Sequence, residues 1–551
     1  MSRTRQLSAF AVICVCELLI VLDMTIINVA LPQIGIELET SITGLQWVVD
    51  AYTLTFSGFL LAFGNLGDRY GRKLMLAGGL AGLGLSSIIG AVADDMAWVL
   101  VSRALMGFFA AAVLPATLAI ITNIFPDPKE KSLAIGIWSS IAGVAVAIGP
   151  ISGGYLLTHF SWHSVFWLNV PVAAVALFLA WRLVPNSKAA SVGRLDWPGV
   201  VLSIAGISIG VFAIIEAPRY GWLSATTLIG FALSVVLIVA FIRRELTTDS
   251  PVLDMRLFRI RPFALPALAI AVGYFSLFGF LFLITQYFQG VREYTPLAFG
   301  IATLPFAAAL AVSAPTATVI AQKVGTMPPL VLGLVLIGAG LIVGGQVELD
   351  SSYLTLVLPA MILLAIGIAI IQGPATESIM SSVPLDEAGA GSAVNDTTRE
   401  IGGTLGVAVI GSIASSYYLT HVRTIVDGIP AGLMNDTEKE YARSSVLSVL
   451  QIRERDIPAF FDPARNALID QMKQAALTGS AHASYLAAGA VFVCAVVVAI
   501  GLPRRYRTSG IVGDQVETLA KEGVVKQVLV EQDTVSEGVA SEERPTPQGQ
   551  R

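Results

Sequence analysis

Fourteen long apolar runs constrain the fold of this chain more than any other feature of its sequence. A helix of about 20 apolar residues is long enough to cross the hydrocarbon core of a bilayer. Only 13% of the 551 residues are charged, whereas soluble proteins carry about 25%. We therefore predict an all-α membrane protein with about fourteen transmembrane helices. The runs lie near 9–30, 45–66, 74–93, 97–121, 133–157, 164–184, 198–216, 224–242, 262–285, 297–321, 329–346, 354–373, 391–416 and 481–502.

Lysine and arginine are distributed unevenly over the two sides of these runs. The N-terminal side carries nineteen of them in its short segments, and the opposite side carries only Arg219 and Arg292 in its short loops. Cytoplasmic loops are enriched in Lys and Arg. We therefore predict that both termini are cytoplasmic and that Asn435 faces outside. Arg3 and Arg5 precede an apolar run as in a secretory signal, but no small-residue cleavage site follows, so we interpret this run as a retained first span.

The loop lengths favour a 6 + 2 + 6 arrangement, and transporters are commonly built from repeated bundles of this kind. The predicted parts are a six-helix bundle at 1–185, a linker with two additional helices at 186–261, a second six-helix bundle at 262–503 with a long extracytoplasmic loop at 417–480, and a cytoplasmic, disordered tail at 504–551. Within the long loop, Asp462–Ala476 shows helical spacing, with Pro463 at its start. The tail holds one amphipathic candidate, Val516–Val530.

The most specific motif runs from Gly64 to Lys73 and reads Gly-Asn-Leu-Gly-Asp-Arg-Tyr-Gly-Arg-Lys. We place it in the cytoplasmic loop between the second and third spans. Its glycines permit a tight reversal, and its charges can pair with helix ends or with one another. A plain positively charged turn is the alternative interpretation. The residues that we single out are Gly64, Asp68, Arg69, Gly71, Arg72 and Lys73.

With this loop the chain resembles the major facilitator superfamily, and further residues resemble its fourteen-helix drug:proton antiporter branch, the multidrug and quaternary-ammonium resistance exporters. The resemblance covers about residues 9–502. The matching residues are Leu22–Pro32 in the first span; Trp47, Tyr52 and Leu54 in the second; Arg103 and Gly107 in the fourth; and Gly143, Gly149, Pro150, Gly153 and Gly154 in the fifth. One departure is Met106, where the branch commonly has glutamine.

The fifth-span segment Gly149-Pro150-Ile151-Ser152-Gly153-Gly154 also has a physical interpretation of its own. Pro150 removes a backbone hydrogen bond and can kink the helix, and small residues allow neighbouring helices to approach closely. Ordinary helix packing explains this pattern as well as a functional role does. The resemblance favours a role in the direction of transport.

Ionisable residues inside a span cost at least about 2.5–3.5 kcal/mol and are functional candidates by default. Asp23 and Arg103 lie at similar depths, about 10 Å and about 9 Å from the outer surface at 1.5 Å per residue. If their spans adjoin, as the resemblance implies, the two residues can form an ion pair. That pair is either part of proton coupling or a static salt bridge.

Further ionisable residues occur in the first and thirteenth apolar runs. Glu17 lies about 120° around its helix from Asp23, so the two point in different directions. Asp396, Arg399 and Glu400 are spaced to share one helix face, which fits either a proton carrier or a self-compensated cluster. We expect Asn28, Asp50 and Arg399 to line the substrate cavity, although solvation at the outer end explains Asp50 equally well.

Energetics favours more than one proton-carrying acid. A proton that enters down 100 mV supplies about 2.3 kcal/mol, and one pH unit adds about 1.36 kcal/mol. Exchange of one proton for one monovalent cation cancels the electrical part. A pump for cations therefore needs a second acid besides Asp23, and Glu17, Asp396 and Glu400 are the candidates.

The sequence argues against other classes of function. It contains no Gly-Lys pair, hence no phosphate-binding loop for ATP, and its four histidines lack metal-ligand spacing. No clustered set of residues suits a lipid-modifying enzyme, and the glycine motif disfavours a channel. We expect a monomeric, multi-pass transporter of the bacterial cell membrane that exports hydrophobic or amphipathic molecules in exchange for protons, without a cofactor or nucleic acid partner. The alternative is export of one endogenous metabolite, lipid or siderophore.

Overall fold

The computed structural model describes residues 3–188, 195–248, 251–383, 388–427, 429, 436–454 and 462–502. Every regular element in these ranges is a helix. Fourteen helical segments among them are long and apolar enough to cross a membrane. The predicted all-α membrane fold is therefore confirmed. Asn435, the segment Val516–Val530 and the tail 504–551 lie outside the described residues.

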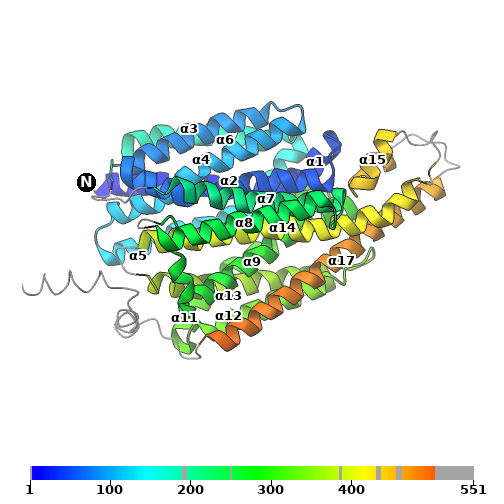
Figure 1. Cartoon of the computed structure of the whole chain (residues 1–551). Helices are drawn as coiled ribbons and strands as arrows, with labels where there is room; N and C mark the ends of the chain where they lie inside the picture. Colours follow the sequence, from blue (N-terminus) through cyan, green and yellow to red (C-terminus); the bar gives the residue numbers. More distant parts are fainter. Residues whose placement is uncertain are drawn as a thin grey trace, which may run out of the picture.

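The first six helices form the N-terminal bundle, and α1, α2, α3, α4 and α6 lie together in the upper part of Figure 1. Polar caps start three of them: Ser41 accepts a hydrogen bond from Gly44 N at the start of α2, Asp95 accepts one from Trp98 N at the start of α4, and Asp127 accepts one from Glu130 N at the start of α5. Such caps satisfy backbone N–H groups that the helix itself cannot. The helices are α1 (Arg3–Glu37), α2 (Ile42–Tyr70), α3 (Arg72–Ala91), α4 (Met96–Ile124), α5 (Pro128–His159) and α6 (His163–Leu183).

Two linker helices follow, α7 (Trp197–Tyr220) and α8 (Ala225–Thr247). They pack on each other, and the Arg244 guanidinium donates three hydrogen bonds to the Asp196 carboxylate beside them. Helix α7 also packs against α2 and α14. A short 3₁₀ turn, Met255–Arg259, connects the linker helices to the rest of the protein.

The remaining spans form the C-terminal bundle in the lower part of Figure 1. Three of its spans depart from a regular α-helix: α9 continues into a π-helical turn, another π turn precedes α13, and Thr303 separates α10 from α11. The elements are α9 (Arg261–Thr285), η2 (Gln286–Val291), α10 (Pro296–Ala302), α11 (Leu304–Val324), α12 (Met327–Gly344), η3 (Tyr353–Val357), α13 (Leu358–Ser381), α14 (Ala388–Asp427), α15 (Asp436–Ser444), α16 (Ser448–Glu454) and α17 (Asp462–Gly501).

The predicted loop at 417–480 is much shorter than we expected, because the helices on both sides extend into it. Tyr418, Val422 and Val426 are buried at successive helical positions and carry α14 to Asp427. Tyr418 also donates to the Ala442 carbonyl of α15 at 2.9 Å. The helix that we predicted at Asp462–Ala476 exists, and it continues without a break into the last span as α17.

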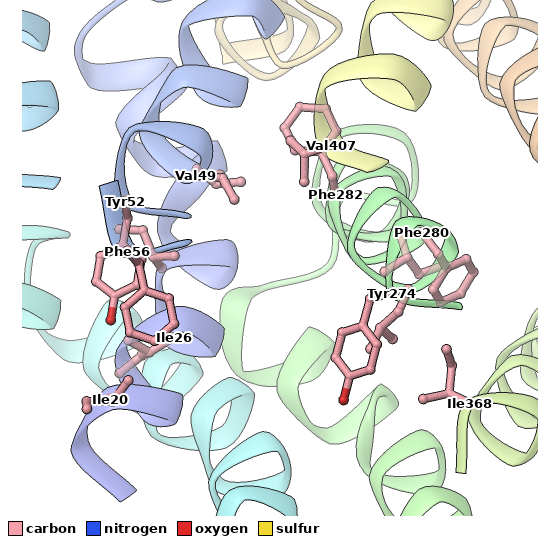
Figure 2. Packing of buried hydrophobic residues seen from close by; sticks show 14 of the residues in the cluster. Ile20, Ile26, Val49, Tyr52, Phe56, Tyr274, Phe280, Phe282, Ile368 and Val407 are labelled. Carbon is pink, nitrogen blue, oxygen red and sulfur yellow. The ribbon is translucent and has the colours of Figure 1, made fainter. Parts of the chain in front are cut away.

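The two ends of the molecule are named here by the course of α1. The N-terminal face is the end at which Arg3 lies, where Arg3 pairs with Glu130 at 2.7 Å and Arg72 N donates to Ser187 O. The far face is the opposite end, where α1 ends and α15 lies (Figure 1). The boundary between the N- and C-terminal bundles is called the seam. Figure 2 shows buried residues of both bundles, with Tyr52 and Phe56 in one and Tyr274 and Ile368 in the other.

Candidate functional site

The glycine-rich segment from Gly64 to Lys73 is almost entirely helical, so our placement of it in a loop is wrong. Helix α2 runs to Tyr70 and α3 begins at Arg72, which leaves Gly71 alone between them. Gly71 has φ of 122°, a conformation that residues with a Cβ rarely adopt. Gly71 therefore reverses the chain in one residue, while Gly64 and Arg69 belong to the helix before it.

This short reversal brings Asp68 and Arg72 together. Arg72 Nε donates to Asp68 Oδ1 at 2.8 Å, and Arg72 Nη1 donates to the Ala119 carbonyl of α4 at 3.0 Å. Lys73 Nζ donates to the Trp181 carbonyl of α6 at 2.6 Å. The segment thus ties α2 and α3 to α4 and α6 at the N-terminal face.

The glycines of α5 lie where helices approach most closely. A Cβ at Gly149 would lie 2.1 Å from Thr25 Oγ1, and one at Gly153 would lie 2.8 Å from Ile26, so both glycines face α1. A Cβ at Gly154 would instead lie 2.6 Å from the backbone oxygen of Pro296 in α10. One glycine pair therefore packs within the N-terminal bundle, and Gly154 packs across the seam.

Pro150 belongs to the same contact across the seam. A Cβ at Gly300 would lie 2.4 Å from the Pro150 carbonyl oxygen, so α5 and α10 meet through glycine and backbone on both sides. A proline within a helix leaves one carbonyl without its helical partner. Small residues on both helices permit this approach.

Asp23 and Arg103 form the ion pair that we expected from their depths. Arg103 Nη1 lies 2.7 Å from Asp23 Oδ2, and each residue is only 1% exposed. Arg103 Nε donates to the Val48 carbonyl at 3.0 Å, and the guanidinium lies 4.3 Å from the centre of the Tyr52 ring. The arginine therefore ties α1 and α2 to α4.

Asn169 completes this group, and the sequence analysis missed it. Its Nδ2 donates to Asp23 Oδ1 at 2.6 Å, and the residue is fully buried. An asparagine in an apolar run beside Pro171 is a polar signal that a search for charged residues alone passes over. The group of Asp23, Arg103, Tyr52 and Asn169 is called the matched site below.

The second acidic group lies at the seam and joins Glu17 of α1 electrostatically to residues of α14. Arg399 Nη1 lies 3.4 Å from Asp396 Oδ1, and its guanidinium lies 4.6 Å from the centre of the Tyr274 ring of α9. Glu17 of α1 interacts electrostatically with Asp396, Arg399 and Glu400. Glu17 and Glu400 are both buried, and neither Oε2 atom has a hydrogen-bond partner among the described residues. Three acids therefore share one arginine, and we call this group the acidic site.

Asp50 is buried, so the interpretation that it is solvated at the end of its span is wrong. It has no exposed surface, and its Oδ1 accepts a long hydrogen bond of 3.4 Å from Thr53. Thr404 of α14 donates to Thr53 at 2.9 Å across the seam. Asn28 is half-buried and donates to the Met24 carbonyl of its own helix at 2.9 Å.

Two glutamines that the sequence analysis did not single out connect the bundles toward the far face. Gln46 Nε2 of α2 donates to the carbonyls of Val407 and Ala408, each at 3.0 Å. Gln289 Nε2 donates to the Val29 carbonyl of α1 at 3.1 Å. These contacts hold the two bundles together in the half of the seam nearer the far face.

Among the described residues, no group of three or more His, Cys, Asp or Glu side chains is placed to hold a metal ion.

Comparison with known proteins agrees with this architecture. The model of the Major Facilitator Superfamily matches residues 13–407. The multidrug efflux pump LfrA of Mycolicibacterium smegmatis is 34% identical, over 91% of this chain and 97% of that protein. The puromycin resistance protein pur8 of Streptomyces alboniger is 35% identical, over 78% of this chain and 87% of that protein.

Among solved structures, a bacterial homologue of the human lysosomal transporter Spinster, in an inward-facing and unoccupied conformation, has a similar fold. The TM-score is 0.60 at 16% identity, over 92% of this chain and all of the other. Fourteen membrane-spanning helices and these relatives identify a multi-pass protein of the cell membrane. The chain belongs to the major facilitator superfamily and is a transporter.

Proposed function

We propose that this protein exports hydrophobic or amphipathic small molecules, many of them cations, in exchange for protons. Its relatives support export of drugs: besides LfrA and pur8, the methyl viologen resistance protein SmvA of Salmonella typhimurium is 32% identical, over 84% of this chain and 93% of that protein. Methyl viologen is a dication and puromycin is an amphipathic antibiotic. One transport path for both needs an apolar cavity with excess negative charge.

The observation that carries the proposal is the surplus of buried acid at the seam. Glu17, Asp396 and Glu400 share the single cation Arg399. A buried carboxylate without a counter-charge is costly, and either a proton or a cationic substrate removes that cost. Competition between the two for one group of acids is the simplest basis for exchange.

Asp23 serves in this proposal as the acid that couples proton movement to conformation. With Arg103 beside it, the carboxylate is paired and has no need of a proton. A rearrangement that draws Arg103 away leaves the carboxylate buried and unpaired, which favours uptake of a proton. Alternation between these two situations moves a proton with each cycle, and a second proton comes from the acidic site.

The predicted orientation gives this cycle its direction. With both termini in the cytoplasm, the far face is outside, and the contacts of Gln46, Gln289 and Gly154 close the outer half of the seam. Substrate then enters from the N-terminal face or from the inner leaflet.

A dedicated exporter of one metabolite is the second candidate. It is favoured by the similarity to the tetracenomycin C resistance and export protein of Streptomyces glaucescens, which is 31% identical over 75% of this chain and 77% of that protein. The two candidates differ in substrate range rather than in mechanism.

An uptake panel in inside-out membrane vesicles tests both. Methyl viologen, a quaternary ammonium dye, puromycin and tetracenomycin C are offered under an imposed pH gradient that is acidic inside. We expect accumulation of several unrelated compounds and its loss when a protonophore collapses the gradient. Accumulation of one compound alone would favour the dedicated exporter, and accumulation that ignores the protonophore would contradict proton exchange.

A further inference from the structure

The Asn169 amide of α6 holds the second carboxylate oxygen of Asp23, opposite Arg103. Asn169 Nδ2 donates to Asp23 Oδ1 at 2.6 Å, and Arg103 Nη1 donates to Asp23 Oδ2 at 2.7 Å. An ionised carboxylate only accepts hydrogen bonds. The arrangement therefore suits ionised Asp23, with one donor for each oxygen.

The other end of the same amide has no partner. Asn169 Oδ1 is buried and accepts no hydrogen bond from any described residue. A buried acceptor without a donor is destabilising and calls for an explanation. The oxygen and nitrogen of an asparagine amide occupy nearly equivalent positions, so turning the amide over exchanges an acceptor for a donor with little change in shape.

Protonated Asp23 needs the opposite partner. Its carboxyl O–H must donate, and a guanidinium has donors only, so Arg103 cannot accept from it. The nearby Val48 carbonyl already accepts from Arg103 Nε at 3.0 Å. Asn169 Oδ1, after the amide turns over, is an acceptor at hydrogen-bond distance from Asp23 Oδ1.

We propose that Asn169 is the positioning residue that accommodates both protonation states of Asp23, donating to the carboxylate and accepting from the carboxyl group. A hydronium ion breaks one of its O–H bonds, gives the proton to Asp23 Oδ1 and becomes water. The Nδ2–H···Oδ1 hydrogen bond then gives way to an O–H donated to Asn169 Oδ1, and Arg103 keeps its charge throughout. The role of this step in export rests on the proposed function, whereas the exchange of hydrogen bonds rests on the geometry alone.

The charged and titratable groups around Asp23 come from two neighbouring helices. Arg103 approaches from α4, and Tyr52 approaches from α2 with its ring against that guanidinium. Glu17 and Glu400 interact electrostatically with Tyr52 from the side of the acidic site. Because these groups also respond to pH, the signal of Asp23 has to be identified by its loss in Asp23→Asn.

Infrared difference spectroscopy of the purified full-length protein in lipid vesicles, titrated with pH, tests this proposal without any substrate. The carboxyl C=O band that Asp23→Asn abolishes reports protonated Asp23. With asparagine that is isotope-labelled at its terminal amide, the amide C=O band that Asn169→Leu abolishes reports Asn169. We expect the two bands to change together in the wild type, since Asn169 Oδ1 gains a hydrogen bond when Asp23 takes up a proton.

In Asn169→Leu we expect the titration of the Asp23 band to shift, because the hydrogen bond from the amide to the charged oxygen is lost. Asn169→Gln keeps both groups and should stay close to the wild type. Gln33→Leu is the matched control, since it removes an amide of α1 that donates only to the Leu157 carbonyl. If the leucine variant fails to insert, Asn169→Val serves the same purpose.

An unchanged titration in the apolar variant, or an asparagine band that does not follow Asp23, would overturn the role of Asn169. The proposed function is judged separately, from accumulation of methyl viologen by wild-type proteoliposomes under a pH gradient. Failure of that accumulation would contradict proton exchange and would leave the infrared result valid.

Discussion

The two groups of buried charge in this transporter are built differently. In the matched site, each oxygen of Asp23 has its own donor, Arg103 or Asn169. In the acidic site, Arg399 is shared by three acids, and Glu17 and Glu400 each keep an unpartnered oxygen within the described part of the protein. The matched site needs no further charge partner while its helices stay in place. In the proposed function, the acidic site binds a cation or a proton.

In the proposed function, the matched site and the acidic site therefore have different tasks. The matched site lies inside the N-terminal bundle, tied to α2, α4 and α6, and separation of Arg103 from Asp23 requires those helices to move. The acidic site lies at the seam between the bundles, and in the proposed function the substrate reaches it there. In the proposed function, coupling belongs to the first site and selection of cations to the second.

The two sites can act together only if the bundles pack closely across the seam. Gly154 lies in that contact, and we expect its replacement to have the largest effect. Gly154→Leu places an isobutyl group against the Pro296 and Leu297 backbone, which has no room for it. We expect export to be abolished, and Gly153→Leu to do the same through α1. Gly136→Leu in the same helix is the control, since its Cβ would meet nothing within 4 Å. Normal vesicle export by the Gly154 variant would reduce the motif to tolerant packing.

The ion pair of Asp68 and Arg72 lies at the N-terminal face, where both side chains are partly exposed, and in this it differs from the buried pair of the matched site. Because water reaches both side chains and screens their attraction, the pair contributes little to stability, so Asp68→Asn and Arg72→Ala should fold. We expect transport to slow by about tenfold, about 1.4 kcal/mol, because Arg72 also holds the Ala119 carbonyl of α4. Initial rates in proteoliposomes provide the measurement, and near-normal rates in correctly inserted protein would refute a gating role.

The acidic site should distinguish charged from neutral substrates. Glu400→Gln and Asp396→Asn each remove one negative charge, and a loss of about 1.4 kcal/mol weakens binding about tenfold. We expect this loss for methyl viologen and little change for a neutral substrate. Asp350→Asn, at an exposed acid, is the control. Equal losses for both classes of substrate in a binding assay would remove the assignment of cation selection to this site.

The spans were predictable from the sequence because hydrocarbon requires about 20 apolar residues in a row. The pairing of Asp23 with Arg103 was predictable from their equal depths, once α1 and α4 were taken to adjoin. The full length of α14 was not predictable from the sequence. Tyr418, Val422 and Val426 follow polar residues and form a buried stripe only against α15 and its neighbours.

What the sequence could not supply is the direction in which each residue of a span points. A helix that is apolar all round has no preferred face, so the sequence left open whether Asp50 lines the cavity or is solvated, and Asp50 is fully buried. Asn169 and Gln46 are neutral and carry no charge to mark them, although their contacts define the matched site and the closed half of the seam. Gly71 also shows that a motif rich in glycine can be helical up to its last turn.

The proposed proton exchange depends most on Asp23 as the coupling acid, and a measurement of uphill transport by Asp23→Asn tests this role directly. Proteoliposomes that contain wild type, Asp23→Asn or Asp23→Glu are given a pH gradient, and accumulation of methyl viologen is measured beside exchange at equilibrium. We expect Asp23→Asn to insert and exchange substrate but to lose accumulation against a gradient, and Asp23→Glu to keep part of it. Accumulation by the asparagine variant equal to that of the wild type would show that Asp23 does not couple protons to export.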